Sequence, residues 1–220
     1  MYNEAIYISP KYKLGDYQEL FKRLKPNSNF SDWEQAIKIF QDRIHGRFLD
    51  TIMQLKQECE GDSSLSKAFS IMAINCLLIE TLQQFYDGLD NFEGKSRKKF
   101  KEFLANSQYF NGKDSGQFRQ SFNKTKAGTF YSNVRCGILH QAQTKGNTVL
   151  TYYNNCLIDD VSTPGVIKYD VKLFTEALIA EYEQYILVLS SNKDIRAREN
   201  FCKKWGYIID RNLNKNNNDK

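Results

Sequence analysis

The chain has 220 residues, of which 41% are hydrophobic, 26% are charged and 14% are aromatic. This length and apolar content predict one domain with a packed core, and they exclude wholesale disorder. The net charge of +5 is compatible with a nucleic-acid partner without requiring one. No apolar run reaches the about 18 residues that a membrane span needs, and residues 1–16 lack a signal-peptide pattern. We therefore expect a cytoplasmic protein with no membrane association.

Cysteine and histidine usage restricts the possible chemistry. Five cysteines are scattered without a C-x-x-C spacing, which indicates reduced thiols rather than a disulfide framework or a zinc site. The only histidines are His45 and His140. The sequence has no Walker loop, dinucleotide-binding glycine fingerprint, H-E-x-x-H motif or EF-hand loop. It therefore predicts no cofactor and no metal, and it gives no support to ATP hydrolysis, hydride transfer or zinc proteolysis.

The first half of the chain reads as an arm followed by two long helices. Residues 1–30 form an N-terminal arm with one short helix near 16–24. The S-D-W-E capping box that starts at Ser31 and the apolar steps of three and four predict a long amphipathic helix that Gly61 ends. A second helix, over 64–87, is apolar nearly all round and is expected to be buried.

The second half contains further helices and a short β segment. The patterns predict helices over 97–125 (with a break near 111–115), from Thr129 to Gly146, from Asp170 to about 190, and over about 193–204, followed by a disordered tail from Asn212. Two β-branched and aromatic stretches near 147–169 predict a small β-hairpin. The fold class is therefore all-α, a bundle of four to five main helices with a β-hairpin insertion. As domains, we expect the arm 1–30, a helical domain 31–205 and a tail 206–220.

Arg135 and His140, in V-R-C-G-I-L-H-Q, are the residues best suited to catalysis. An imidazole can take a proton from a hydroxyl near neutral pH, and a guanidinium can hold a phosphate through its fork of donors. Five residues on an ideal helix correspond to a rotation of about 140° and a rise of about 7.5 Å, so one chain places the two side chains on different faces. Two copies of the helix packed about a two-fold axis would bring them together.

This pattern resembles the HEPN superfamily. The resemblance rests on the Arg-x4-His spacing in a late helix of a bundle, on F-Y-S-N-V-R-C-G-I-L-H-Q-A-Q-T and on the upstream C-L-L-I-E-T-L-Q-Q-F-Y. It covers about residues 32–190 and extends to a group of uncharacterised bacterial proteins. Many members of the superfamily are metal-independent endoribonucleases of toxin–antitoxin and phage defence systems. The resemblance therefore implies a bacterial ribonuclease, a hydrolase that acts as a homodimer through the 129–145 helix.

Carried onto this sequence, the resemblance implies that Arg135 binds the scissile phosphate and that His140 is the general base or acid toward the ribose 2′-hydroxyl. Cys136 departs from the family pattern, because active members commonly carry Asn, Asp or His directly after the motif arginine. A thiol is a weaker hydrogen-bond partner than any of these. An antitoxin or a nucleotidyltransferase is the partner expected beside the RNA.

Polar and basic residues near the motif are candidates for RNA binding. They are Asn133, Gln141, Gln143 and Lys145, together with Lys98 and Lys99 from the basic run 95–101. Glu80 interrupts the apolar helix and must be paired, hydrogen-bonded or neutralised, so it is a supporting residue or a purely structural partner for a Lys, an Arg or a backbone group. Cys136 and His140, four residues apart, also allow a nucleophile–base pair, but no orienting third group accompanies them. His45 reads as a surface or interface residue.

Two functions remain open on the sequence alone. The first is metal-independent cleavage of RNA. The second is a non-catalytic HEPN-like module that binds RNA or a nucleotide, or that serves in dimerisation. Arg135 paired with Glu80 inside the bundle, and His140 packed as an ordinary structural residue, would favour the second.

Overall fold

The computed structural model describes residues 6–60, 66–112 and 122–218, with side chains up to Arg211. The chain divides into two compact units that are interleaved in sequence. The first unit comprises residues 1–50, 84–92 and 184–220, and the second comprises 51–83 and 93–183. This division differs from the consecutive arm, domain and tail that the sequence predicts, because the long helices α4 (Ala68–Asp87) and α8 (Val171–Ser190) contribute residues to both units.

The first unit is helical with a small two-stranded sheet. Its elements are β1 (Tyr7–Ser9), β2 (Tyr12–Lys13), α1 (Leu14–Arg23), α2 (Phe30–Ile44), the π-helical turn η1 (His45–Leu49), the ends of α4 and α8, and α9 (Ile195–Asn218). Aromatic side chains fill its core, where Phe21 stacks on Trp205 with ring centroids 4.2 Å apart and Phe40 contacts Phe85 at 4.6 Å. The short helix expected near 16–24 is therefore confirmed as α1.

A buried arginine joins three segments of the first unit. The Arg198 side chain lies over the Trp33 ring, 4.2 Å from its centroid, and donates to the carbonyl oxygens of Leu189 and Pro26 at 2.9 and 3.0 Å. It also donates to Asn192 Oδ1 at 2.7 Å. Pro26, near the end of the predicted arm, is thus tied to α8 and α9 of this unit through Arg198.

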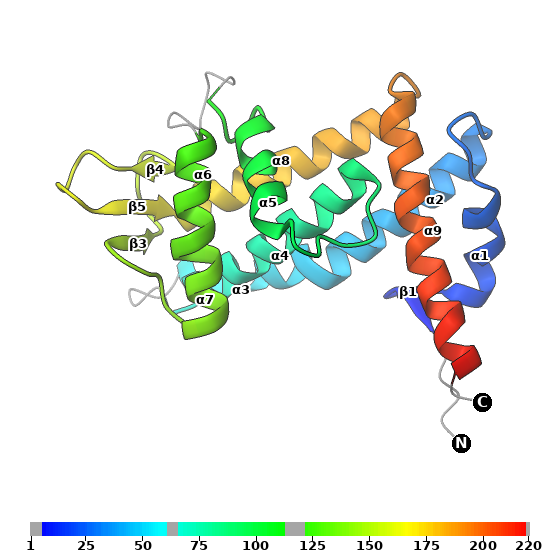
Figure 1. The fold of residues 1–220 in the computed structure, drawn as a ribbon, viewed down its shortest axis with the longest axis horizontal. Coiled ribbons are helices and arrows are strands. Elements are labelled where there is room, and N and C mark those ends of the chain that lie inside the picture. Colours follow the sequence, from blue (N-terminus) through cyan, green and yellow to red (C-terminus); the bar gives the residue numbers. More distant parts are fainter. Residues whose placement is uncertain (1–5, 61–65, 113–121, 219–220) are drawn as a thin grey trace. The chain divides into compact units, whose positions relative to one another are not determined.

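The second unit packs helices around another aromatic core. Its elements are α3 (Asp50–Glu60, from Thr51 onward), most of α4, α5 (Ser96–Asn106), α6 (Lys124–Phe130), the π-helical turn η2 (Tyr131–Arg135), α7 (Cys136–Gln141), the start of α8 and a small sheet. Phe130 stacks on Phe174 and meets the edge of Tyr169, each at 4.9 Å. In Figure 1, α6 and α7 follow one another as a single helical run beside the small sheet.

The sheet is not the hairpin that the sequence predicts. It has the strand order β3 (Thr148–Thr151), β5 (Ile167–Asp170), β4 (Ile158–Asp159), with β3 parallel to β5 and β4 antiparallel to β5. A parallel pair needs a long connection, and residues 152–166 supply it while also carrying β4. The two expected strands are thus neighbours, but in the opposite relative direction.

Several predicted helix ends are shifted. The cap of α2 is Asn29 rather than Ser31, because the Asn29 side chain accepts from the Asp32 amide at 2.9 Å. The capping prediction at Asp170 is confirmed, since its Oδ1 accepts from the Leu173 amide at 2.9 Å at the start of α8. The expected end at Gly61 and most of the break near 111–115 lie outside the described residues.

The C-terminal segment is helical where a short helix and a tail were expected. Helix α9 runs from Ile195 to Asn218, beyond the predicted end near residue 204. Trp205 and Ile209 lie on its buried side, at 0% and 1% exposure. Burial of these apolar side chains at i and i+4 stabilises the extension.

Helix α4 is long and apolar enough to span a membrane by length and composition alone. It has 20 residues with a hydropathy of 1.3 over the apolar window, and 56% of that window is buried within the protein. The core helix of a soluble protein passes the same test.

Candidate functional site

The predicted catalytic residues lie on the helical run formed by α6, η2 and α7. The run starts earlier than the expected Thr129, because Asn123 Oδ1 accepts from the amides of Thr125 and Lys126 at 3.0 and 2.9 Å. It ends at Gln141 rather than at Gly146, since Ala142 adopts a left-handed conformation with φ 54°. This left-handed residue turns the chain back, as helix C-termini commonly do.

The returning segment packs on Gly137. A Cβ atom at this position would lie 2.5 Å from the Gln143 carbonyl oxygen and 3.2 Å from the Lys145 nitrogen. The absence of a side chain at Gly137 is therefore what allows residues 143–145 to cross the helix. This chain's own backbone therefore occupies the space over Gly137.

Arg135 forms an ion pair with Glu80 of α4. Its Nε and Nη2 atoms both lie 2.9 Å from Glu80 Oε1, and the two side chains are 17% and 18% exposed. Burial alone would lower the pKa of Arg135, but the hydrogen bond and the negative charge of Glu80 raise it above the ordinary value. The expectation that Glu80 must be paired is thus met by Arg135.

Three further polar groups surround this pair. The Arg135 guanidinium lies over the ring of Tyr131 at 5.4 Å, and Cys136 hydrogen-bonds with it. Cys76 is fully buried and is close enough to feel the charges of Arg135 and Glu80. Burial raises the pKa of its thiol. Arg135 is therefore held in a defined orientation with three of its five N–H donors left after the Glu80 contact.

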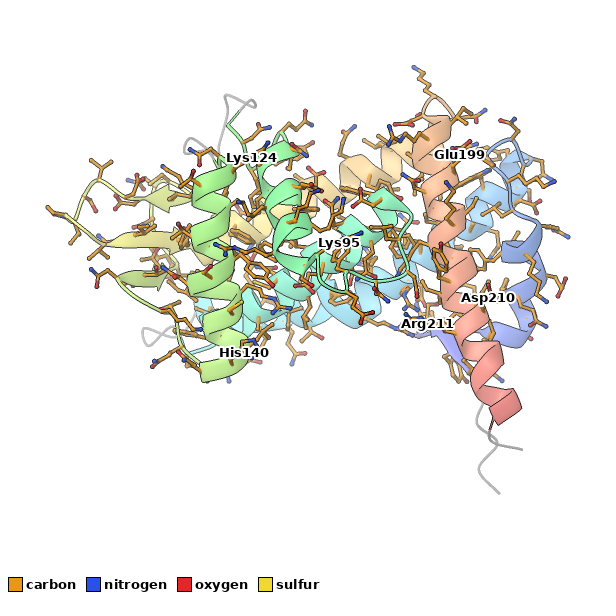
Figure 2. All side chains as sticks on the ribbon, in the orientation of Figure 1. Lys95, Lys124, His140, Glu199, Asp210 and Arg211 are labelled. Carbon is orange, nitrogen blue, oxygen red and sulfur yellow. The ribbon has the colours of Figure 1, made fainter. Side chains whose placement is uncertain are left out.

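His140 occupies the last turn of α7 and is exposed to solvent. Among the described residues it has no hydrogen-bond or ion-pair partner. Figure 2 shows it at the end of the helix, at the surface. One chain therefore does not bring Arg135 and His140 together, because Arg135 is directed to Glu80 while the imidazole faces water. The Cys136–His140 pair also lacks an orienting third group within the described part of the chain, since no side chain there binds His140.

The predicted RNA-binding residues near the motif fall into two groups. Gln141 and Gln143 are exposed. Asn133 instead fixes the returning segment, because its side-chain nitrogen donates to Thr148 Oγ1 at 3.1 Å and its carbonyl accepts from the Lys145 amide at 2.9 Å. The side chain of Asn133 and the backbone of Lys145 thus have a structural role.

A basic groove lies along α5 and the start of α6. It has a volume of about 810 Å³ and is lined by Gly94, Arg97, Lys98, Lys101, Glu102, Asn106 and Lys124. Lys98 is thus in the groove, with its Nζ 3.9 Å from Glu102 Oε1, whereas Lys99 is not among the lining residues and binds Glu102 Oε2 at 2.8 Å. Lys101 crosses Gly128 of α6, where a Cβ atom would meet its Cε at 3.5 Å.

The basic run 95–101 that the sequence shows already contains Arg97 and Lys101, but nothing in the sequence groups Lys124 with them. The four-residue spacing of Arg97 and Lys101 predicts that these two side chains lie on one face of the helix. Lys124 joins them only through the packing of α6 against α5. Figure 2 labels Lys124 and His140 at opposite ends of the α6–α7 run, which corresponds to about 24 Å along a helix axis.

The remaining chemistry-bearing residues do not form a site of their own. His45 is exposed in the first unit, with its Nδ1 3.6 Å from Asp50 Oδ1. Within the described part of the chain, no three His, Cys, Asp or Glu side chains are grouped so that they would hold a metal ion. No family model, no curated protein and no solved structure matches this chain, so its site is defined by its own residues alone.

Proposed function

We propose that this protein is a HEPN-type endoribonuclease that cleaves RNA without a metal, with Arg135 binding the scissile phosphate and His140 transferring protons. The observation that carries the proposal is the exposed imidazole of His140, five residues after an arginine that Glu80 and Tyr131 hold in place. A free imidazole at the surface is accessible to a ribose hydroxyl, and a preoriented guanidinium loses little entropy on binding a phosphate.

The proposed reaction is an internal transfer at phosphorus. His140 takes the proton of the 2′-hydroxyl, the 2′-oxygen forms a bond to phosphorus, and the bond from phosphorus to the 5′-oxygen breaks. The leaving oxygen receives a proton from a second imidazole or from water. The products are a 2′,3′-cyclic phosphate and a 5′-hydroxyl end. Arg135 stabilises the charge on the phosphate oxygens through the N–H donors that do not contact Glu80 or Cys136.

A homodimer is part of this proposal, because His140 and Arg135 of one chain face different directions. Leu139, directly before His140, is 40% exposed and offers an apolar contact for a second copy of the helix. A Leu139→Glu variant should shift a dimer to monomer in light scattering and should lower cleavage in parallel. A monomeric wild-type protein that still cleaves RNA would contradict the dimer.

The basic groove is the proposed path of the RNA backbone outside the cleavage point. Arg97, Lys98, Lys101 and Lys124 face a single carboxylate, Glu102, in this groove. Such an excess of positive charge attracts the phosphates of a single strand in a sequence-independent way. Gln141 and Gln143, which are exposed beside His140, are available to contact bases or sugars.

The test uses purified protein on a mixed-sequence RNA with EDTA present. We expect the wild type to cleave, and His140→Ala and Arg135→Ala to lose cleavage while remaining folded by circular dichroism. His45→Ala is the matched control, since it removes the chain's other exposed histidine and should leave cleavage unchanged. An RNA with 2′-deoxy substitution at the cleaved position should remain intact, and end-group analysis should find cyclic phosphates.

The second candidate is a non-catalytic module that binds RNA or a nucleotide. The pairing of Arg135 with Glu80 and the presence of Cys136 after the arginine favour it, because both reduce the donors free for a substrate. Intact RNA after incubation with a folded, dimeric wild type would overturn the nuclease and support this module. An antitoxin or nucleotidyltransferase partner belongs to the first candidate and is testable by co-expression, where it should restore growth.

A further inference from the structure

The first unit contains a polar pocket that is separate in sequence from the proposed nuclease residues. The pocket has a volume of about 430 Å³ and is lined by Arg43, Gln84, Asp90, Asn91, Lys204, Ile208 and Arg211. These residues come from α2, from the segment 84–92 and from α9, all within the first unit. Figure 2 labels Arg211 on α9. The lining thus contains three cationic side chains and one carboxylate.

Lys204 is a buried ammonium with neutral partners. It is 7% exposed, and its Nζ donates to Gln84 Oε1 at 2.6 Å and to the backbone oxygen of Asp90 at 2.7 Å. An ammonium carries three donors, so one hydrogen has no acceptor within the described part of the chain. No described carboxylate lies within 4.0 Å of Nζ. Burial lowers the pKa of Lys204 to about 8, although the nearby charge of Asp90 raises it.

Arg43 is a second cation without a carboxylate partner in the described residues. Its Nη1 donates to the backbone oxygen of Ile8, and its guanidinium lies 5.7 Å from the centre of the Trp205 ring. Burial and the neighbouring charge of Arg47 lower the pKa of Arg43 to about 10. Two cations in one pocket, both bound only to neutral acceptors, leave positive charge that an anion would compensate.

The single carboxylate of the pocket is already engaged. Arg211 Nη2 lies 2.5 Å from Asp90 Oδ2. Asp90 therefore neutralises Arg211, and the charges of Lys204 and Arg43 remain. The structure holds these two cations together at the cost of their mutual repulsion, since Arg43 and Arg211 both lower the pKa of Lys204. Repulsion between cations that are held together in a concave polar site is typical of a ligand-binding position.

We propose that this pocket binds a small molecule through a phosphate group, which accepts hydrogen bonds from Lys204 and Arg43. A phosphate monoester carries up to two negative charges and matches both an ammonium and a guanidinium fork. The volume of about 430 Å³ lies within the range of about 300–1,000 Å³ for small-molecule sites, and it leaves room beyond the phosphate for the group that carries it. The proposal does not depend on the cleavage of RNA.

The experiment is a titration of the full chain by calorimetry at constant ionic strength, with sodium chloride replacing each ligand salt. The probes are inorganic phosphate, adenosine 5′-monophosphate, adenosine and succinate. We expect saturable binding of the monophosphate, weaker binding of inorganic phosphate, and no binding of adenosine or succinate. Monophosphate binding should raise the melting temperature in proportion to the logarithm of its concentration.

Variants assign the binding to the pocket. Lys204→Gln and Arg43→Gln should each weaken monophosphate binding by about tenfold or more. Lys203→Gln and Arg196→Gln are the matched controls, because both positions are exposed and remove the same charge without touching the pocket. If Lys204→Gln fails to fold, Arg43→Lys replaces it, since it keeps the charge but removes the guanidinium fork and should still weaken binding.

Three outcomes would overturn the proposal. One is the absence of saturable binding of the monophosphate and of inorganic phosphate to folded wild-type protein. Another is equal affinity in the wild type and in the pocket variants. The third is equal binding of succinate, which would show that the pocket does not select phosphate. Monophosphate binding should persist in His140→Ala, so failure of the nuclease proposal and failure of this one are distinguishable.

Discussion

Both Nε and Nη2 of Arg135 lie 2.9 Å from one oxygen of Glu80, Oε1. This contact joins α4 to the helical run that carries His140, and it fixes the arginine in a half-buried position. The contact orients the Arg135 guanidinium, which is the proposed phosphate-binding group. It also occupies two N–H donors of that guanidinium, which a phosphate would otherwise use.

The Arg135–Glu80 pair should contribute measurably to stability. Arg135→Gln and Glu80→Gln should each lower the free energy of unfolding by about 1–3 kcal/mol, because each leaves a partly buried charge unpaired. The double variant should lower the free energy of unfolding by less than the sum of the two single losses. The exposed pair of Lys67 and Glu58, 3.6 Å apart, is the control and should show a coupling below about 0.5 kcal/mol. Equal coupling in both pairs would contradict the role assigned to burial.

Gly137 should not tolerate a side chain. Gly137→Ala should lower the free energy of unfolding by about 1–3 kcal/mol, because its Cβ would lie 2.5 Å from the Gln143 backbone oxygen and that backbone must move. Gly206→Ala is the matched control, since a Cβ at Gly206 in α9 meets nothing within 4 Å. This control should stabilise the protein by about 0.5–1 kcal/mol through helix propensity. Chemical denaturation of both variants measures the difference, and two changes of the same sign would refute the packing argument.

The basic groove should govern the salt dependence of RNA binding. Arg97→Gln, Lys101→Gln and Lys124→Gln should each weaken the binding of single-stranded RNA and reduce the slope of log affinity against log salt by about 0.7. Lys38→Gln removes one charge outside the groove and serves as the control. Fluorescence anisotropy at several salt concentrations gives the slopes. Unchanged slopes in all three variants would show that the RNA backbone lies elsewhere.

Lys204 should make stability rise with pH above about 8. Its pKa is about 8 in the folded chain and 10.5 in a model peptide, so between these values the unfolded chain binds the additional proton. The free energy of unfolding therefore increases with pH in this window, by at most about 1.4 kcal/mol per pH unit. Below the window, the cost of burying the charged Lys204 ammonium is fully present. The groups around the ammonium are Arg43, Asp90 and Arg211.

The measurement is the difference in unfolding free energy between wild type and Lys204→Met from pH 7 to pH 11. The free energy of unfolding of the wild type should rise relative to that of the variant between about pH 8 and pH 10.5, and the difference should then become constant. Lys203→Met removes an exposed ammonium from the same helix and is the control for loss of a lysine charge on α9. A wild-type curve parallel to that of Lys204→Met would contradict the assigned titration.

Local sequence determined which segments are helical. Apolar residues at steps of three and four predicted α2 with α3. The nearly uniform apolar character of 64–87 predicted α4, and the cap at Asp170 predicted the start of α8. The cap at Asp170 and the need for a partner at Glu80 were also readable, because both follow from the chemistry of one side chain. The helical fold class and the surface position of the polar residues Gln141 and Gln143 required no long-range information.

Tertiary structure alone decided the pairings. The direction of β3 against β5, the return of residues 143–145 over Gly137 and the choice of Arg135 as the partner of Glu80 each join segments far apart in the chain. Residues 206–218 carry no strong helical pattern beyond a few apolar positions, and α9 extends there because Trp205 and Ile209 find a core to enter. The pocket around Lys204 was invisible to the sequence for the same reason, since a lysine at residue 204 is an ordinary surface residue until packing removes it from water.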